Sequence, residues 1–400
     1  MHPKIGTSHN LLLAFSLGTA LLVCDGSTQA QSHAMVYVPS NSKTVVRGYF
    51  PTSRPAVATV PSGAVVRIDT VSHQGLGGNG LDPIAYMATF GVSANEVLPD
   101  ATDIYYNYTI PPGASTHVLT GPIYIEGAEP GDTLEVRILD VEPRVGWGFN
   151  TGGPGGALPN YLSNSYQKLI RIKNRFALFS DDIKVPLSPF QGIMAVAPAS
   201  DYVSPLAASA ALHIVNARPP GPFGGNMDTK QLAAGSALYL PVFQPGAQFY
   251  TGDPHAVQAN GEVSGTALEL SNTVTVEFVL HKNGGLTGPR AETPEYYISM
   301  GIDVDHNVAL EDSLHGALDF LTTEKGLLPQ DAYSLCSLAV DFDIAEAVDY
   351  TNLVTGLIPK WVFDGRCAHG ACGEQAFWRA SPAAKGRSAP LPSAMQPRED

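Results

Sequence analysis

Glycine and proline interrupt this chain at short intervals, which limits the lengths of its helices and strands. The 400 residues include 40 glycines and 32 prolines, where average usage would give about 28 and about 20. Between them lie short runs rich in β-branched residues, at 65–71, 134–141 and 274–281, which are typical of strands. Residues 134–138 alternate between apolar and charged, as in a strand with one buried face. The first two-thirds of the chain therefore predict short strands joined by tight turns.

Helical periodicity is limited to the last third of the chain. Apolar residues from Val308 to Leu321 recur at steps of three and four, and Asp305 is placed to cap the start of that helix. A second helix is expected from Pro329, because proline is favoured at the first helical position. The predicted fold class is α+β, predominantly β, with two helices near the C-terminus.

These signals divide the chain into four expected parts. Residues 1–30 read as a signal peptide, 31–285 as a mainly β core, 286–378 as a smaller α+β part, and 379–400 as a disordered tail. The signal peptide is inferred from the apolar run at 11–23, which is too short to span a membrane. We therefore expect a periplasmic or secreted protein with no membrane attachment after cleavage.

The charge balance argues against a general nucleic-acid-binding role. The formal net charge is −14, and only 15% of the residues are charged, against about 25% in an average globular domain. Binding of nucleic acid needs a basic patch that displaces counterions from phosphate. The acidic composition therefore favours a small-molecule partner over nucleic acid.

Three cysteines follow the expected signal peptide. Cys336 lies in an apolar run and is expected to be an inert buried thiol. Cys367 and Cys372 flank a short glycine-containing segment and favour a local disulfide in an oxidising compartment. His369 between them raises the alternative of metal binding, although a structural zinc site takes four ligands.

The chemistry of the chain is concentrated between residues 224 and 269. Nucleophile-elbow, zinc-helix and phosphate-loop motifs are absent from the sequence. Asn226 and Asp228 are two residues apart, as are Asp253 and His255, so an extended segment would show each pair on one face. With Glu262 and Glu269, such donors suit a divalent cation, zinc or a harder ion such as calcium. The alternative is that these side chains cap turns and hydrogen-bond within loops.

Two other histidines and one glycine-rich segment leave their roles open. His73 and His117 are expected to be structural, although His73 could enter a cleft because glycine loops often line sites. The segment 145–158 reads as a surface loop or as a lid over a substrate cavity.

Several ordered motifs resemble the acetamidase/formamidase family over residues 48–360. They are GPIYIEGAEPGD at 121–132, GGNMD at 224–228, LYLPVFQPGA at 238–247, GDPHAVQ at 252–258 with GEV at 261–263, GTALE at 265–269, and DAY and SLAVD at 331–341. The resemblance implies hydrolysis of short-chain amides to carboxylate and ammonia. It also implies a divalent metal site in a jelly-roll-like β-sandwich.

By position, Asn226, Asp228, Asp253, His255 and Glu269 fall on the family's polar motif residues, and the roles that follow are inferred from the chemistry of the side chains. The expected metal ligands are Asn226, Asp228, Asp253 and His255, and the expected catalytic residues are Glu262 or Glu269 as general base, with His73. Backbone N–H groups of the Gly224–Gly225 turn are expected to stabilise the oxyanion. One departure is that the family usually reads QGDGE where this chain has QANGE at 258–262, which removes one charge and could weaken metal binding or activity.

Two other functions stay open at this point. A secreted, non-catalytic β-sandwich binding protein would keep a metal for structure only. A hydrolase of a larger amide would fit an exported enzyme better, because small amides diffuse freely. The apolar composition is also compatible with a homo-oligomer.

Overall fold

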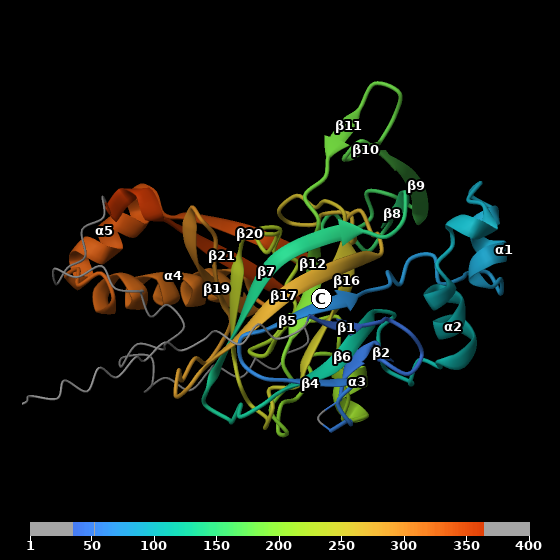
Figure 1. Ribbon diagram of the computed structural model, residues 1–400. Coiled ribbons are helices and arrows are strands. Elements are labelled where there is room, and N and C mark those ends of the chain that lie inside the picture. The colour runs from blue at the N-terminus through green and yellow to red at the C-terminus, as the bar shows by residue number, and fades with distance from the viewer. Residues whose placement is uncertain (1–34, 52, 364–400) are drawn as a thin grey trace, which may run out of the picture. The chain divides into compact units, whose positions relative to one another are not determined.

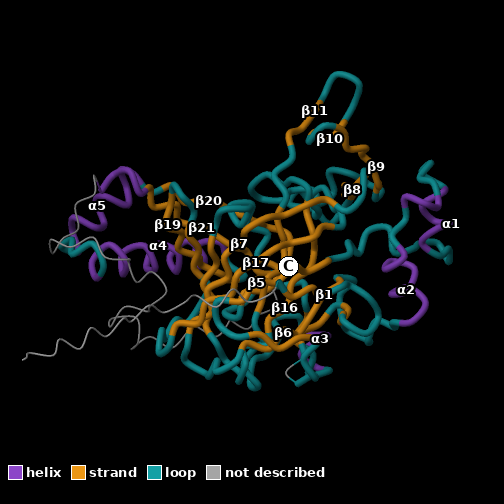
Figure 2. The backbone as a smooth tube through the Cα atoms, in the orientation of Figure 1, coloured by secondary structure: helices purple, strands orange, loops and turns teal. Residues whose placement is uncertain are grey.

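The computed structural model describes residues 35–51 and 53–363. The expected signal peptide, Cys367, Cys372 and the tail lie outside these residues. Strands fill the centre of the described chain and helices flank them (Figures 1 and 2). The α+β, predominantly β class is confirmed, and the jelly-roll arrangement stays a prediction.

The larger sheet has nine strands, antiparallel except at the β1–β5 edge. Its spatial order is β1 (Val36–Val38), β5 (Ala64–Asp69), β17 (Asn272–His281), β7 (Thr133–Pro143), β15 (Ala237–Pro241), β18 (Arg290–Glu292), β19 (Tyr296–Asp303), β21 (Thr351–Pro359) and β20 (Asp341–Asp349). This sheet runs on across residue 285, where the two parts of the chain were expected to divide.

The second large sheet carries the site. Its strands are β14 (Gly224–Asn226), β12 (Phe190–Ala195), β16 (Phe249–His255), β6 (Val118–Ile125) and β2 (Val45–Arg47), with β4 (Ala58–Val60) parallel to β6. A separate pair joins β3 (Tyr49–Phe50) to β13 (Val215–Asn216).

The two large sheets bury one common apolar core. Val66 and Ile68 of β5 and Phe278 of β17 belong to the same cluster as Ile123 of β6 and Phe249 of β16. The rings of Phe249 and Phe278 meet edge to face with centroids 4.9 Å apart. Burial of each such side chain contributes about 1.5–3 kcal/mol, so the contact between the sheets stabilises the framework that carries β16 and β6.

The two C-terminal helices are present as predicted. Helix α4 (His306–Thr323) packs on β19 and β21, and α5 (Pro329–Ala339) packs on α4 (Figure 1). The carboxylate of Asp305 caps α4 by accepting a hydrogen bond from Asn307 N–H at 2.8 Å. Cys336 is buried, as expected.

Earlier helices correct the expectation that the first two-thirds are strands. They are α1 (Pro83–Ala88), η1 (Ala94–Glu96), α2 (Pro99–Asn107) and α3 (Ala207–Ala211), and η2 (Lys360–Phe363) follows β21. Helices α1 and α2 both begin at a proline, and the Asp82 carboxylate caps α1. These local start signals outweighed the short apolar runs.

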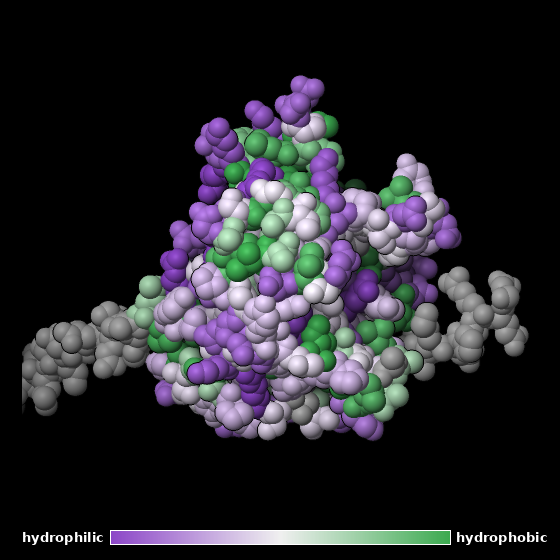
Figure 3. All heavy atoms as spheres, turned by 90° about the vertical axis from the view of Figure 1, so that its right-hand side faces the viewer, coloured by the Kyte–Doolittle hydropathy of each residue, from purple (hydrophilic) through white to green (hydrophobic). Residues whose placement is uncertain are grey.

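The glycine-rich segment expected to be a loop is partly a strand. It forms β8 (Trp147–Gly152), which joins β9 (Tyr166–Lys173), β10 (Phe176–Leu178) and β11 (Lys184–Pro186) in a four-stranded sheet. The β10–β11 hairpin projects from the two large sheets (Figure 1). In the space-filling view, the projection at the top of the molecule carries hydrophobic surface among hydrophilic residues (Figure 3). At the opposite edge of this four-stranded sheet, Phe149 of β8 forms a backbone β-bridge with Glu269, so β8 holds the segment that carries Glu269. Among the described helices, none is long and apolar enough to cross a membrane.

Candidate active site

A cavity of about 330 Å³ opens beside β14, β16 and the start of β6. Six of the seven site residues named from the sequence line it: His73, Asn226, Asp228, Asp253, Glu262 and Glu269. The seventh, His255, is fully buried behind Asp253. The sequence motifs therefore converge on one place in the fold.

Strand β16 provides the central pair of this cavity. Asp253 and His255 lie near its end, and β12 and β6 pair on either side of the strand. Glu269 is held opposite by backbone bridges to His255 and Phe149. His73 follows β5 and His117 immediately precedes β6, so two separate segments carry imidazoles to the same carboxylate.

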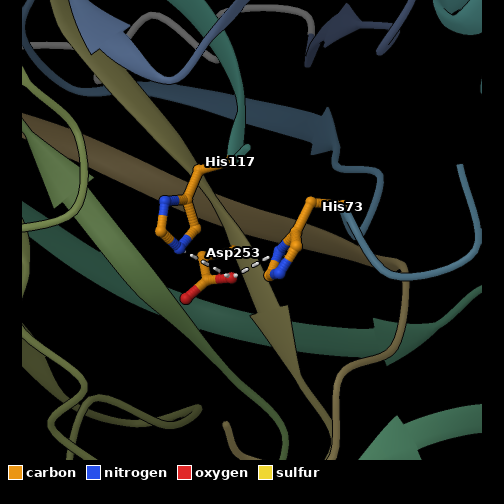
Figure 4. A group of neighbouring side chains, drawn as sticks. All are labelled: His73, His117 and Asp253. Carbon is orange, nitrogen blue, oxygen red and sulfur yellow. Dashed lines mark ion pairs between the residues drawn. The ribbon is translucent and has the colours of Figure 1, made fainter. Parts of the chain in front are cut away.

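Three side chains form the most open donor group in the cavity (Figure 4). Asp253 Oδ1 lies 3.4 Å from His73 Nδ1 and 3.8 Å from His117 Nε2. The two imidazole rings meet edge to face with centroids 5.0 Å apart. Tetrahedral zinc, with bonds of about 2.0–2.2 Å, places its ligand atoms about 3.3 Å apart. Two nitrogens and one carboxylate oxygen at these separations fit a catalytic zinc site.

Behind this group lies a second, fully buried one. His255 Nε2 is 3.1 Å from Asp253 Oδ2 and 3.2 Å from Glu269 Oε1. Its other nitrogen, Nδ1, is 3.7 Å from Asp228 Oδ1. His255 therefore joins three carboxylates at the base of the cavity.

Burial and mutual charge set the protonation of these groups. Burial opposes ionisation of Asp253, but His255 and His117 beside it hold the pKa of Asp253 well below its usual range. Burial lowers the pKa of His117 to about 3, with a contribution from nearby His73. The imidazole of His117 is thus neutral, as a metal ligand must be.

Three other carboxyl groups of the cavity have raised pKa values, in contrast to Asp253. Burial, together with neighbouring carboxylates, raises the pKa of Asp228 and of Glu262 well above their usual ranges. The pKa of Glu269 is also raised, by burial and then by Asp253, against the effect of His255. Carboxyl groups with raised pKa can carry a proton near neutral pH, as general acid–base catalysis requires.

Several buried polar atoms in the site have no hydrogen-bond partner among the described residues. They are His73 Nδ1, Asp228 Oδ1, Asp253 Oδ1, His255 Nδ1 and Glu269 Oε2. An unsatisfied buried polar group costs about 1–3 kcal/mol, and more when it is charged. Two of these atoms, His73 Nδ1 and Asp253 Oδ1, belong with His117 to a group that could hold a metal ion. A divalent cation there would satisfy both, so these three residues fit the expected metal.

The backbone of the site is strained at three of its acids. Asp228, Asp253 and Glu262 have φ values of 42°, 51° and 44°. Each such non-glycine residue costs about 1–3 kcal/mol and persists only where the surroundings hold it in place. This concentration of strain on cavity-lining carboxylates is typical of a functional site.

The structure adds residues that the sequence analysis did not place in the site. His117, expected to be structural, lines the cavity beside Asp253. Asp349 accepts hydrogen bonds from Asn226 Nδ2 at 2.7 Å and from Arg218 Nε at 3.0 Å. Asn226 Nδ2 also donates to Asp228 Oδ2 at 2.8 Å. The only sequence signal for a site role of His117 is that it lies four residues before the GPIYIEG motif, which starts at Gly121.

The expected oxyanion role of Gly224 is wrong. Its N–H donates to the Gly221 carbonyl at 3.0 Å, and neither Gly224 nor Gly225 is among the residues that line the cavity. Asn260 also lies outside that lining and donates to Asp343 Oδ2 at 2.8 Å. An aspartate at 260 would face Asp343 with like charge, so asparagine suits this position.

The chain is similar to known proteins in both sequence and fold. Residues 111–214 and 202–365 match the family model described as the Acetamidase/Formamidase family. The chain is 28% identical over 318 residues to the formamidase of Methylophilus methylotrophus, covering 62% of this chain and 77% of that protein. It is 30% identical over 224 residues to a Schizosaccharomyces pombe protein with a formamidase name, covering 42% of this chain and only 52% of that relative. The crystal structure of an acetamidase from Yersinia enterocolitica has a TM-score of 0.67 at 26% identity, covering 86% of this chain and 97% of that chain.

Proposed function

Because the chain belongs to the acetamidase/formamidase family, we propose that it hydrolyses the C–N bond of short-chain amides to carboxylate and ammonia. The observation that carries this proposal is one cavity in which His73, His117 and Asp253 meet beside further buried carboxylates. Such a cavity combines side chains that can hold a metal ion with carboxyl groups that can transfer protons. Metal-assisted amide hydrolysis requires both.

The proposed metal ligands are His73 Nδ1, His117 Nε2 and Asp253 Oδ1. Two nitrogens in the set favour zinc over calcium, which takes oxygen ligands. When bound, zinc supplies a Lewis acid that polarises an amide carbonyl and makes water more acidic. His73 therefore acts in this proposal as a ligand rather than as a catalytic acid or base.

The other residues named from the sequence support these ligands. His255 Nε2 lies between Asp253 and Glu269, so it orients the carboxylate of Asp253. Asn226 bridges Asp228 and Asp349 through its amide nitrogen. Asp228 in turn faces His255 Nδ1.

Glu269 is the proposed general base. Its Oε1 is held near His255 Nε2, while Oε2 has no hydrogen-bond partner in the described part of the chain. Glu269 would take a proton from the attacking water and return it to the leaving nitrogen. Glu262, which lines the same cavity with a raised pKa, is the second candidate for this transfer.

The direct test is ammonia release from formamide, acetamide and propionamide by the purified mature protein, with and without a chelator. We expect release that the chelator abolishes and added zinc restores. His117→Ala should lose both activity and bound metal, whereas His306→Ala, at an exposed histidine, should lose neither. Chelator-resistant release by wild type, or full activity of His117→Ala, would exclude the metal scheme.

A larger amide is a second candidate substrate. The cavity volume of about 330 Å³ falls at the lower end of the range for pockets that hold drug-sized ligands, about 300–1,000 Å³. Formamide and acetamide would fill only part of it. If kcat/KM rises steadily through a series of longer primary amides, the larger substrate is favoured, and a maximum at two or three carbons favours the short-chain amide.

Export of the protein is a separate proposal that rests on the N-terminal apolar run. Fusion of residues 1–30 to a reporter that is active only outside the cytoplasm should give signal. A matched fusion with two charges placed in residues 11–23 should give none. Absence of reporter signal from both fusions would contradict export.

A homo-oligomer is a separate proposal, and light scattering of the mature protein in solution would test it by measuring its molar mass.

A further inference from the structure

The two nitrogens of the His73 imidazole face different groups. Nδ1 points toward Asp253 Oδ1 (Figure 4) and has no hydrogen-bond partner among the described residues. Nε2 lies 3.1 Å from the side-chain amide nitrogen of Gln74. Because a neutral imidazole has one N–H donor and one acceptor nitrogen, the group that meets Nε2 decides what Nδ1 can bind.

Gln74 is the first member of a chain of hydrogen-bonded side chains. Gln167 Nε2 donates to Gln74 Oε1 at 3.0 Å, and the hydroxyl of Tyr86 donates to Gln167 Oε1. Gln167 lies on β9 and Tyr86 on α1. The chain therefore connects His73 to two elements that stand outside the cavity.

Packing holds the far end of this chain in place. The buried ring of Tyr86 meets Phe90 edge to face with centroids 5.3 Å apart, and Phe90 meets Phe149 at 4.9 Å. A Cβ added at Gly78 would lie 2.6 Å from the Tyr86 ring, so there is no free space on that side. Gln167 is paired with Thr151 of β8. The chain is thus fixed by the fold, whether or not the cavity holds a metal.

A chain of this kind has two polarities. Each glutamine amide offers N–H donors at one end and an acceptor oxygen at the other, and a rotation of 180° exchanges the two ends. In one polarity, Gln74 Nε2 donates to His73 Nε2, and the neutral imidazole carries its proton on Nδ1. In the reverse polarity, His73 Nε2–H donates to Gln74 Oε1, and Nδ1 keeps its lone pair.

The reverse polarity is the one that suits a metal. A metal takes the lone pair of a neutral imidazole, so Nδ1 must carry no proton. A protonated Nδ1 would have to donate to Asp253 Oδ1, and their separation of 3.4 Å is longer than the usual 2.7–3.2 Å for such a hydrogen bond. The same separation is close to that of two ligand atoms on one tetrahedral zinc.

We propose that Gln74, held by Gln167 and Tyr86, is a positioning residue that accepts the Nε2–H of His73 and so leaves Nδ1 free to bind the metal. This inference rests on the proposed function, which makes His73 a ligand. Metal-bound histidines donate their second N–H to an acceptor in this way, and loss of that acceptor weakens metal binding.

The test compares the zinc affinities of Gln74→Leu and Gln74→Glu with that of wild type, by competition with a chromogenic chelator. Leucine removes the acceptor at similar size, and affinity should fall about 10- to 100-fold. Glutamate supplies a carboxylate that can accept from both His73 Nε2–H and Gln167 Nε2–H, so affinity should equal or exceed that of wild type. Gln330→Leu, at an exposed glutamine of α5, should match wild type.

Two further measurements separate positioning from a merely structural role and from a contact with substrate. A long-range ¹H–¹⁵N spectrum of zinc-loaded wild type should show His73 protonated at Nε2. At saturating zinc, Gln74→Leu should keep the wild-type KM for acetamide within about threefold. A thermal melt checks that each variant is folded, and the glutamate variant and the wild-type spectrum decide the matter if the leucine variant is not.

Four results would overturn the inference. They are unchanged zinc affinity in folded Gln74→Leu, an equal loss in Gln74→Glu, a proton on Nδ1 of His73 in the zinc-loaded protein, or a raised KM with unchanged zinc affinity, which would make Gln74 a substrate contact. Wild type that binds zinc but hydrolyses no amide would refute the proposed function and leave the positioning of His73 standing. Amide hydrolysis with unchanged zinc affinity in Gln74→Leu would do the opposite.

Discussion

Gly192 is the position where a single methyl group should do most damage to the site. It lies on β12, opposite the end of β16 that carries Asp253 and His255. A Cβ added there would lie 2.3 Å from Asp228 Oδ1, 2.7 Å from Asp253 Oδ2 and 2.8 Å from His255 Cε1. All three neighbours are buried, so Gly192→Ala must displace the site rather than a flexible surface group.

The size of the displacement follows from the contacts. Real Cβ atoms essentially never approach closer than 3.0 Å, so Asp228 Oδ1 has to move by about 0.7 Å, from 2.3 to 3.0 Å. A misplacement of about 1 Å costs on the order of 10²-fold in rate, and overpacking a buried site costs about 1–3 kcal/mol. We therefore expect Gly192→Ala to lower kcat/KM for acetamide about 100-fold and the free energy of unfolding by about 1–3 kcal/mol.

The assay is ammonia release together with urea unfolding. Gly288→Ala is the matched control, because its added Cβ meets no heavy atom within 4 Å. Gly288→Ala should match wild type in both measurements. If Gly192→Ala kept wild-type kcat/KM and unfolding midpoint, the packing of the carboxylates against β12 would be refuted.

Three other perturbations test separate parts of the structure. Burial opposes ionisation of Asp132, but Lys282 and the N–H groups of Asn283 and Glu129 hold the pKa of Asp132 below its usual value. The ionised carboxylate therefore stabilises the folded protein above the pKa that Asp132 has when unfolded, and this stabilisation is lost as the pH falls through the folded-state pKa. Asp132→Asn should therefore flatten the fall in the free energy of urea unfolding below about pH 4. Phe278→Ala should lower the free energy of unfolding by about 3–5 kcal/mol, because its ring is fully buried between the two sheets; a loss under 1 kcal/mol would contradict that packing. Asp349→Asn should weaken zinc binding by about tenfold or more in chelator competition, and an unchanged affinity would show that the hydrogen bonds through Asn226 do not reach the ligands.

The part of the site that lies on one strand was predictable from the sequence. Asp253 and His255 are two residues apart, and the structure brings both to one carboxylate and imidazole cluster. The C-terminal helices were predictable for a similar reason, since their apolar periodicity and proline start are local signals. Asp132 also belongs to a recognisable motif, but its role is structural because it accepts from the backbone of a turn.

Other parts depended on contacts between segments far apart in the chain. His117 lies among weakly patterned residues, and only the pairing of β6 with β16 brings it to Asp253. Asp349 reaches Asn226 across 123 residues of sequence. The left-handed backbone at Asp228, Asp253 and Glu262 also has no sequence signal, because glycine is the residue that usually marks it.

The most direct test of the account is a zinc titration of the dialysed protein, with bound zinc and acetamide hydrolysis measured on the same samples. We expect activity that rises in proportion to bound zinc and saturates at about one zinc per chain. His117→Gln should show neither tight zinc binding nor activity. Full activity in wild-type protein stripped of metal, or saturation by zinc without any ammonia release from acetamide, would contradict it.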